Sequence, residues 1–286
     1  MAAKSGRTQF WIAFFMGIVI LALPFSYALF KFSKIGEQPQ PKVEENYYPQ
    51  SSDSITLLVA LKNDEGSEPD CFVLSKISPQ NSAVTLAVFP PEILVEDAGS
   101  FQPADEVWDD EGAKRGATAI ENAVGIEADR WMELDSQAIV RLGDVAGAVD
   151  MTLDEQVSVE NGLLTLPAQR QLIDGTRAAL LMSYDDYTGG EQQRLEMVAK
   201  LAEQFIYQRL PLMNEHSLLE LFETAVNNGS SDLVIGDFET RRRAFSHMTS
   251  ADVNVILAPV SGEYSDDGES FLLSSQCLSQ LKQEFS

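Results

Sequence analysis

Residues 69–95 read PDCFVLSKISPQNSAVTLAVFPPEILV and contain two apolar runs separated by a short polar stretch. The runs, residues 71–77 and 82–89, have the composition of β-strands, and the SPQN between them is a tight-turn signal. The second run ends at two prolines and Glu92. Proline donates no ladder hydrogen bond and fixes φ, so strands do not normally end this way. We therefore predict a strand–turn–strand unit with a candidate site at its proline end.

The same kinds of pattern continue on both sides of this unit as alternating strands and helices. Residues 55–61, 130–135 and 147–153 are further predicted strands. Apolar residues at three- and four-residue spacing predict the helices, and Ser136 is expected to cap one of them. Residues 254–260 and 269–275 are expected to pair as a hairpin. The predicted helices cover residues 113–125, 136–147, 191–210, 215–226, 236–248 and 276–285. Strands alternating with helices predict an α/β domain with a central mixed β-sheet flanked by helices on both faces.

The charge of the chain limits its partners. It has 44 acidic residues against 20 Lys and Arg among 286, and four of those bases but no acid lie in the first 34 residues. The remainder therefore carries 16 bases against 44 acids. A domain this acidic has no surface that could neutralise nucleic-acid phosphates, so we expect no nucleic-acid partner. Anionic lipid headgroups and anionic wall polymers are expected to be repelled as well.

Cysteine and histidine are too few for a disulfide framework or for a zinc or iron site. Cys71 and Cys277 lie far apart in the sequence, and only two histidines, His216 and His247, are present. Two buried free thiols are the expectation, and a single Cys71–Cys277 bridge is the alternative.

The first 54 residues predict a membrane tether. Residues 10–31 form an apolar run, charge-free from 10 to 30 and about 30 Å long as a helix, which matches a bilayer core. We predict a short cytoplasmic tail at 1–9, a transmembrane helix at 10–31, a polar linker at 32–54 and an extracytoplasmic domain at 55–286. The alternative is a cleaved signal peptide, because residues 26–28, SYA, resemble a cleavage site. Both place the domain outside the cytoplasmic membrane.

The order of these segments resembles the LytR-CpsA-Psr (LCP) family over nearly the whole domain. Residues 69–95 look like the family's strand, turn and strand ending in a Pro-Arg-Asp tripeptide. Residues 119–151 look like its helix, strand, helix and glycine turn, and residues 171–201 like its Leu-Asp-Gly segment leading to an Arg-rich helix. The residues that match these motifs are Asp144, Gly147, Val149, Asp174, Gly175 and Arg194.

The resemblance implies a fold and an activity. LCP proteins are extracytoplasmic and are tethered by one N-terminal helix. Active members are phosphotransferases that move an anionic glycopolymer from a polyprenyl-pyrophosphate carrier to peptidoglycan, with arginines and a divalent metal holding the pyrophosphate.

Most of the family's chemical residues are replaced in this sequence. Pro91 and Glu92 stand where the Arg and Asp of the tripeptide are expected, and Leu61 stands where a metal-binding Asp is expected. An Arg-Ser-Asp segment has become Glu68, Pro69 and Asp70. Further expected arginines fall on Ser183, Asp185 and Glu191, and the family Gln falls on Leu195. A pyrophosphate needs cations, and acids in their place repel it by about 1–4 kcal/mol per close pair.

Three residues remain as candidates for a vestigial site. Asp70 is a weak candidate metal ligand, but a single carboxylate makes a poor divalent site, so a polar residue that starts a strand after Pro69 is the favoured interpretation. Glu92 could replace the family Asp, or could be a solvated acid after the proline kink. Arg194 could hold a phosphate, or could be a surface partner of Glu191 on the same helix.

Three other charged stretches have simpler explanations. Arg241–Arg243 form the only basic cluster of the domain, and such runs usually balance adjacent acids on a solvated helix face. The acidic loops at 183–191 and 263–269 lack EF-hand spacing and are interpreted as ordinary loops.

Two functional hypotheses follow. The first is a membrane-anchored LCP-like protein of the bacterial cell envelope without transferase activity, which binds, scaffolds or regulates in cell-wall polymer assembly. The second is a diverged LCP phosphotransferase. We expect no cofactor under the first and Mg²⁺ under the second. Candidate partners are the cell membrane through residues 10–31, and a cell-wall glycopolymer, polyprenyl lipid or envelope protein.

Overall fold

A computed structural model describes residues 47–62, 68–159 and 164–286. The predicted transmembrane helix at 10–31 and most of the predicted linker therefore lie outside the described residues. Among the residues that are described, no helix is both long enough and apolar enough to cross a membrane. The chain divides into two compact units, Met1–Tyr47 and Tyr48–Ser286, and the second is the unit considered below.

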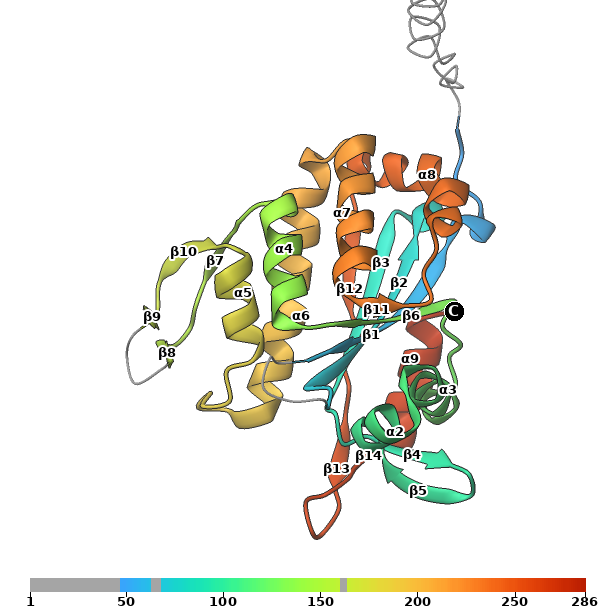
Figure 1. The fold of residues 1–286 in the computed structure, drawn as a ribbon, viewed down its shortest axis with the longest axis vertical. Helices are drawn as coiled ribbons and strands as arrows, with labels where there is room; N and C mark the ends of the chain where they lie inside the picture. Colours follow the sequence, from blue (N-terminus) through green and yellow to red (C-terminus); the bar gives the residue numbers. More distant parts are fainter. Residues whose placement is uncertain (1–46, 63–67, 160–163) are drawn as a thin grey trace, which may run out of the picture. The chain divides into compact units, whose positions relative to one another are not determined.

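A six-stranded mixed sheet forms the centre of this unit (Figure 1). β2 (Cys71–Ser78) lies antiparallel between β1 (Ile55–Leu61) and β3 (Ala83–Phe89). β6 (Arg130–Leu134) extends the sheet parallel to β1, and β12 (Asn254–Leu257) extends it parallel to β3. The short β11 (Ser230–Ser231) completes the order β11-β6-β1-β2-β3-β12. The prediction of a central mixed sheet is confirmed.

Helices cover both faces of this sheet, as predicted. Phe72 and Phe89 point into a core closed by α2 (Ala104–Glu111), α3 (Ala113–Val124) and α9 (Ser275–Glu284). The intervening Val73 and Val88 point to the opposite face, as strand alternation requires. That second core is closed by four helices: α4 (Ser136–Ala146), α6 (Gly190–Arg209), α7 (Glu215–Asn228) and α8 (Ile235–Ser250).

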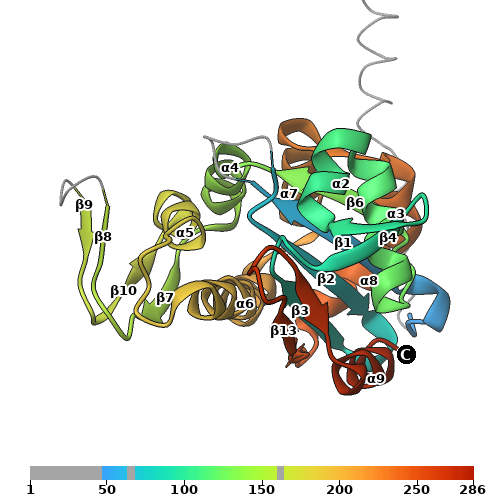
Figure 2. The same ribbon diagram turned by 90° about the horizontal axis from the view of Figure 1, so that it is seen from below.

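A third cluster of buried residues lies beside the sheet, where two short strand pairs and one helix pack next to α6 (Figure 2). β7 (Val149–Thr152) pairs with β10 (Arg170–Ile173), and β8 (Val157–Val159) pairs with β9 (Leu164–Leu166). α5 (Gly175–Met182) packs on this layer through Leu181, which is fully buried. The sequence predicted only the first of these strands.

The predicted C-terminal hairpin is wrong. β12 pairs with β3 at the sheet edge, whereas β13 (Gly262–Tyr264) pairs with β14 (Phe271–Leu273). The strand predicted at 254–260 therefore ends at Leu257. Ala258 still donates a hydrogen bond to the Leu86 carbonyl, but Pro259 has no amide hydrogen and cannot continue the ladder.

The helix cap predicted at Ser136 is one residue out. Asp135 is the N-cap of α4, and its carboxylate accepts a hydrogen bond from the Ala138 amide at 2.7 Å. A short carboxylate satisfies the same unpaired amide that a serine hydroxyl would satisfy.

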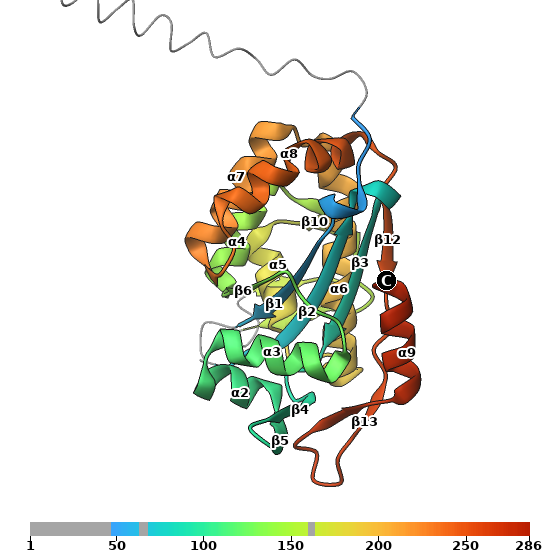
Figure 3. The same ribbon diagram turned by 90° about the vertical axis from the view of Figure 1, so that its right-hand side faces the viewer.

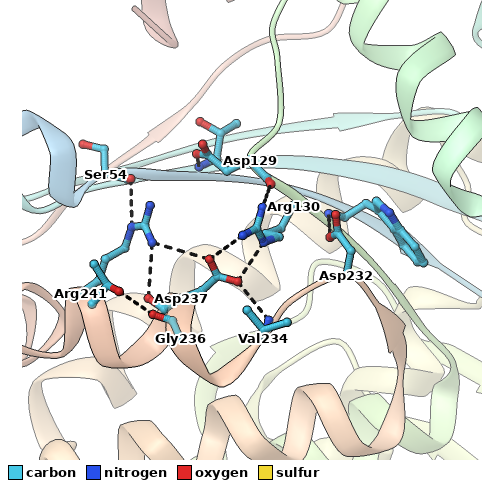
Figure 4. A network of polar contacts seen from close by, with 11 residues as sticks. Ser54, Asp129, Arg130, Asp232, Val234, Gly236, Asp237 and Arg241 are labelled. Carbon is cyan, nitrogen blue, oxygen red and sulfur yellow. Dashed lines mark hydrogen bonds and ion pairs between the residues drawn. The ribbon is translucent and has the colours of Figure 1, made fainter.

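A charged network ties the beginning of the domain to α8 (Figure 4). The Arg130 guanidinium donates two hydrogen bonds to the Asp237 carboxylate, at 2.8 and 2.9 Å. Arg241, one helical turn further along α8, donates to the Ser54 carbonyl at 3.2 Å just before β1. Although partial burial of Asp237 opposes it, the hydrogen bonds from Arg130 lower the pKa of this carboxyl. The interpretation that the Arg241–Arg243 run balances nearby acids is confirmed for Arg241 and for Arg242, which pairs with Glu215.

Candidate functional site

Strand directions bring the segments that carry Asp70 and Glu92 to the same edge of the sheet. β2 is antiparallel to both neighbours, so its beginning lies next to the ends of β1 and β3. Cys71 is paired with Leu61, and Phe72 is paired with Phe89. The loop before β2 and the proline segment after β3 therefore leave the sheet side by side.

Arg194 joins this edge from α6. Its guanidinium donates to the Asp70 carbonyl at 2.7 Å and to the Met182 carbonyl at 3.4 Å. It also donates to both oxygens of the Glu191 carboxylate, at 2.8 and 2.7 Å. The three predicted site residues thus meet: Arg194 bonds the backbone of Asp70, and its charge acts on Glu92.

The donors of Arg194 are almost completely used. A guanidinium has five N–H donors, and the four hydrogen bonds above occupy four of them. The side chain is only 5 % exposed. Burial opposes its charged form, but the bidentate Glu191 carboxylate more than compensates and raises the pKa of Arg194. Little donor capacity remains for an external phosphate.

The pairing with Glu191 was one of the two explanations that the sequence offered for Arg194, and it is confirmed. The expected place on the helix surface is wrong, because Arg194 is buried against the ends of β2 and α5. The long apolar stripe of α6 placed the helix against the sheet, and Arg194 falls on the buried side with Met197, Val198 and Leu201.

The position of Glu92 disfavours a charged carboxylate. Its Oε2 atom is buried and has no hydrogen-bond partner among the described residues. Burial raises the pKa of Glu92, and the negative charges of Glu191 and Asp105 raise it further, against the opposing charge of Arg194. Glu92 is therefore a partly buried acid rather than a fully solvated one. Tyr264 of β13 stands nearby, and burial together with the charge of Glu92 raises the pKa of this phenol to about 12.

Cys71 is buried beneath Arg194 and is a free thiol, as is Cys277. Burial raises the pKa of the Cys71 thiol to about 12, although the positive charge of Arg194 acts in the opposite direction. A thiol with such a pKa is not a nucleophile at neutral pH. The expectation of two buried free thiols is confirmed.

The cavity beside Asp70 is very small. Its volume is about 10 Å³, the room of roughly one water, and Leu61, Cys71 and Ser183 are among the residues that line it. Lys62 also lines it, a cation that the sequence analysis missed although it directly follows β1. Its ammonium is paired with the Glu133 carboxylate at 3.3 Å.

Within the described ranges, no three His, Cys, Asp or Glu side chains lie close enough together to hold a metal ion. Leu61, which stands where a metal ligand is expected, is a buried core residue. The role of Asp70 as a weak metal ligand stays a prediction.

The other acids expected at this place divide into two groups. Glu191 does lie there, on Arg194. Glu68 acts electrostatically on Asp105, whose pKa is raised first by burial and then by this neighbouring charge. Asp185 is exposed, and no contact ties it to Arg194. Of the acids that the sequence placed beside Arg194, Glu191 therefore contacts it directly, and Asp185 does not.

Comparisons with known proteins place the fold. Neither a family model nor a curated protein sequence matches the chain. Solved structures do match. A protein of Eubacterium siraeum described as a transcription regulator has a TM-score of 0.75 at 15% identity, over 86% of this chain and 95% of that one. TagV of B. subtilis has a TM-score of 0.66 at 14% identity, over 81% and 97%. TagT bound to LI-WTA has a TM-score of 0.65 at 15% identity, over 85% and 93%.

These structures are LCP proteins, and the resemblance found in the sequence is confirmed by them. The chain has the LCP fold over almost the full length of its described domain. Identities of 14–15% establish the fold and nothing finer.

Proposed function

We propose that this chain is a membrane-anchored, extracytoplasmic LCP-fold protein that takes part in cell-wall polymer assembly without transferring a polymer itself. The fold and the TagT, TagU and TagV neighbours support the link to cell-wall polymers. The apolar run at residues 10–31 supports the anchor.

The observation that carries the loss of activity is the internal ion pair on Arg194. Glu191 takes two of its donors and backbone carbonyls take two more, so the chain fills with its own oxygens the place where an arginine of an active LCP protein holds pyrophosphate. A phosphate would have to displace a bidentate carboxylate three residues away on the same helix. The nearby charges of Glu92 and Asp105 would oppose it as well.

Binding of a polyprenyl pyrophosphate tests the proposal. The full-length protein in zwitterionic nanodiscs should show no binding of farnesyl pyrophosphate by titration calorimetry, with or without Mg²⁺. Glu191→Gln removes the carboxylate charge and frees donors of Arg194, so this variant should gain weak binding that salt suppresses.

Glu196→Gln is the matched control. It removes an acid five residues further along α6 that hydrogen-bonds only the Gln192 side chain and leaves Arg194 untouched. It should behave like the wild type. Tight Mg²⁺-dependent binding by the wild type would contradict the proposal and favour a diverged phosphotransferase.

A further inference from the structure

Two hairpins build a small second layer at the end of the domain far from Ser51–Asp53 (η1), where the described chain begins (Figures 1 and 3). β4 (Leu94–Asp97) pairs with β5 (Ser100–Pro103), and β13 pairs with β14. Ile93, directly before β4, forms a parallel bridge with Phe271 of β14. The Phe271 amide donates to the Glu92 carbonyl at 2.7 Å. The two hairpins are separate two-stranded sheets, and this single bridge places the beginning of β4 next to β14.

The register of these strands separates an inner and an outer face. Ile93 and Val95 are buried in the core, and Phe271 packs against the same core. Neighbours along a strand point to opposite faces, and directly paired residues point to the same face. The outer face is therefore formed by Leu94, Glu96, Phe101, Pro103, Glu263 and Leu272.

This outer face holds two exposed apolar side chains, which no described residue covers. Phe101 is 68 % exposed and Leu272 is 47 % exposed. Glu96 lies opposite Phe101 and Glu263 lies opposite Leu272 on the neighbouring strands, and both glutamates are exposed as well. Burying either apolar side chain against a partner would favour the complex.

The segments around this face carry one sign of charge. Residues 92–111 and 259–274 contain twelve acids and no Lys or Arg: Glu92, Glu96, Asp97, Asp105, Glu106, Asp109, Asp110, Glu111, Glu263, Asp266, Asp267 and Glu269. The adjacent Arg115 of α3 is already paired with Asp97 at 2.8 Å and Glu111 at 2.6 Å. Its charge is thus balanced locally, and the potential over the layer is negative.

We propose that this outer face docks a cationic amphipathic segment of a partner protein. Apolar side chains of the segment would cover Phe101 and Leu272, and its Lys or Arg side chains would reach Glu96 and Glu263. The charge selects this occupant: a second copy of this acidic chain, an anionic bilayer or an anionic polymer would be repelled. A purely polar cation would leave the apolar side chains in water. The inference goes beyond the proposed function and does not depend on it.

A defined peptide tests the proposal. The probe is a fluorescent 14-residue peptide, LKKLLKLLKKLLKL, titrated against full-length protein in zwitterionic nanodiscs, with empty nanodiscs as the baseline. We expect saturable binding that weakens with salt. The double variant Phe101→Ser/Leu272→Ser should weaken it about tenfold or more, since each tenfold step needs only about 1.4 kcal/mol.

The control is a pair of equally exposed apolar residues elsewhere. Leu172 of β10 and Leu212 are 58 % and 69 % exposed, and neither belongs to the layer. Leu172→Ser/Leu212→Ser should bind like the wild type. Both double variants should keep the wild-type melting temperature, because all four side chains are exposed. If the layer variant alone melts earlier, Glu96→Gln/Glu263→Gln, which leaves the apolar side chains in place, should still weaken binding.

Other results would overturn the proposal. One is equal binding of a peptide with every Leu replaced by Ser, because binding would then follow charge alone. Another is equal weakening by both double variants. If the protein bound peptide-free zwitterionic vesicles and this binding depended on Phe101, the face would be a membrane-binding surface instead. If the protein self-associated in sedimentation and this depended on Phe101, the face would bind a second copy instead.

Discussion

At the scale of single residues, the site is defined by how one guanidinium is satisfied. Arg194 is held by a carboxylate of its own helix turn and by carbonyls from the start of β2 and the end of α5. The same four bonds therefore join three elements. Breaking one partner of such a buried pair leaves the other uncompensated, so Arg194 supports the fold even where it supports no reaction.

Glu92 should make the stability of the domain depend on pH in a definite direction. Its pKa is raised in the folded state above the ordinary value of 4.5. The folded state therefore binds the proton more tightly than the unfolded state, and stability falls as pH rises from the ordinary pKa through the folded one. Glu92→Gln removes this loss, so the variant should have a higher urea midpoint than wild type at pH 7, with the difference vanishing toward pH 4.

The control for this prediction is Glu96→Gln, which changes an exposed glutamate four residues further along. Its urea midpoint should stay close to that of the wild type at both pH values. A Glu92→Gln protein that is less stable than wild type at pH 7 would contradict the prediction, because it would show that the charged carboxylate stabilises the fold.

The sequence could predict which residues form this site, but not that Arg194 is buried and paired within it. Reading the motif positions gave Asp70, Glu92 and Arg194. Strand order alone brings the segments of Asp70 and Glu92 together, whereas Arg194 reaches them from α6. The burial of Arg194 does not follow from strand order, because it depends on which side of α6 faces the sheet at one position. Lys62 was missed for a similar reason: a lone lysine after a strand carries no signal until its neighbours across the sheet are known.

At the scale of elements, long periodic segments were predictable and short ones were not. β1, β2 and β3 have continuous apolar composition, and α6 has a clear stripe. β4, β5 and β8–β10 have three or four residues each, too few to show a period. The wrong C-terminal hairpin has the same origin: a four-residue strand followed by Pro259 looked like one strand of seven.

The contact between α4 and α5 depends on two glycines and can be tested. A Cβ added at Gly143 would lie 2.3 Å from the Cα of Gly175, and one added at Gly175 would lie 2.4 Å from the Val140 carbonyl oxygen. These are backbone atoms that cannot move aside alone. Gly143→Ala should therefore force the helices apart and destabilise the protein by about 1–3 kcal/mol in urea unfolding.

Gly236 in α8 is the matched control. A Cβ there would meet only the Val234 Cγ2 atom, at 3.9 Å, which is an ordinary contact. Gly236→Ala should be neutral or stabilising by up to about 1 kcal/mol, because alanine loses less entropy in a helix. Equal effects of the two substitutions would mean that the helices do not approach each other through Gly143.

At the scale of the whole molecule, charge is distributed unevenly. The layer built from β4, β5, β13 and β14 lies at one end and carries acids alone, whereas the end at η1 holds the Arg130–Asp237–Arg241 network (Figures 3 and 4). The predicted tether precedes η1 in the sequence.

The proposed orientation of the chain across the membrane can be tested by thiol labelling, because the two native cysteines are not expected to react. Cys71 and Cys277 are both buried. The wild type should therefore take up no membrane-impermeant maleimide in intact, wall-stripped cells. Gln283→Cys adds an exposed thiol to α9, and Ser5→Cys adds one to the predicted cytoplasmic tail. We expect Gln283→Cys to label in intact cells and Ser5→Cys to label only after permeabilisation. Loss of residue 5 from the mature protein would establish a cleaved signal peptide, and protection of Gln283→Cys until permeabilisation would contradict an extracytoplasmic domain.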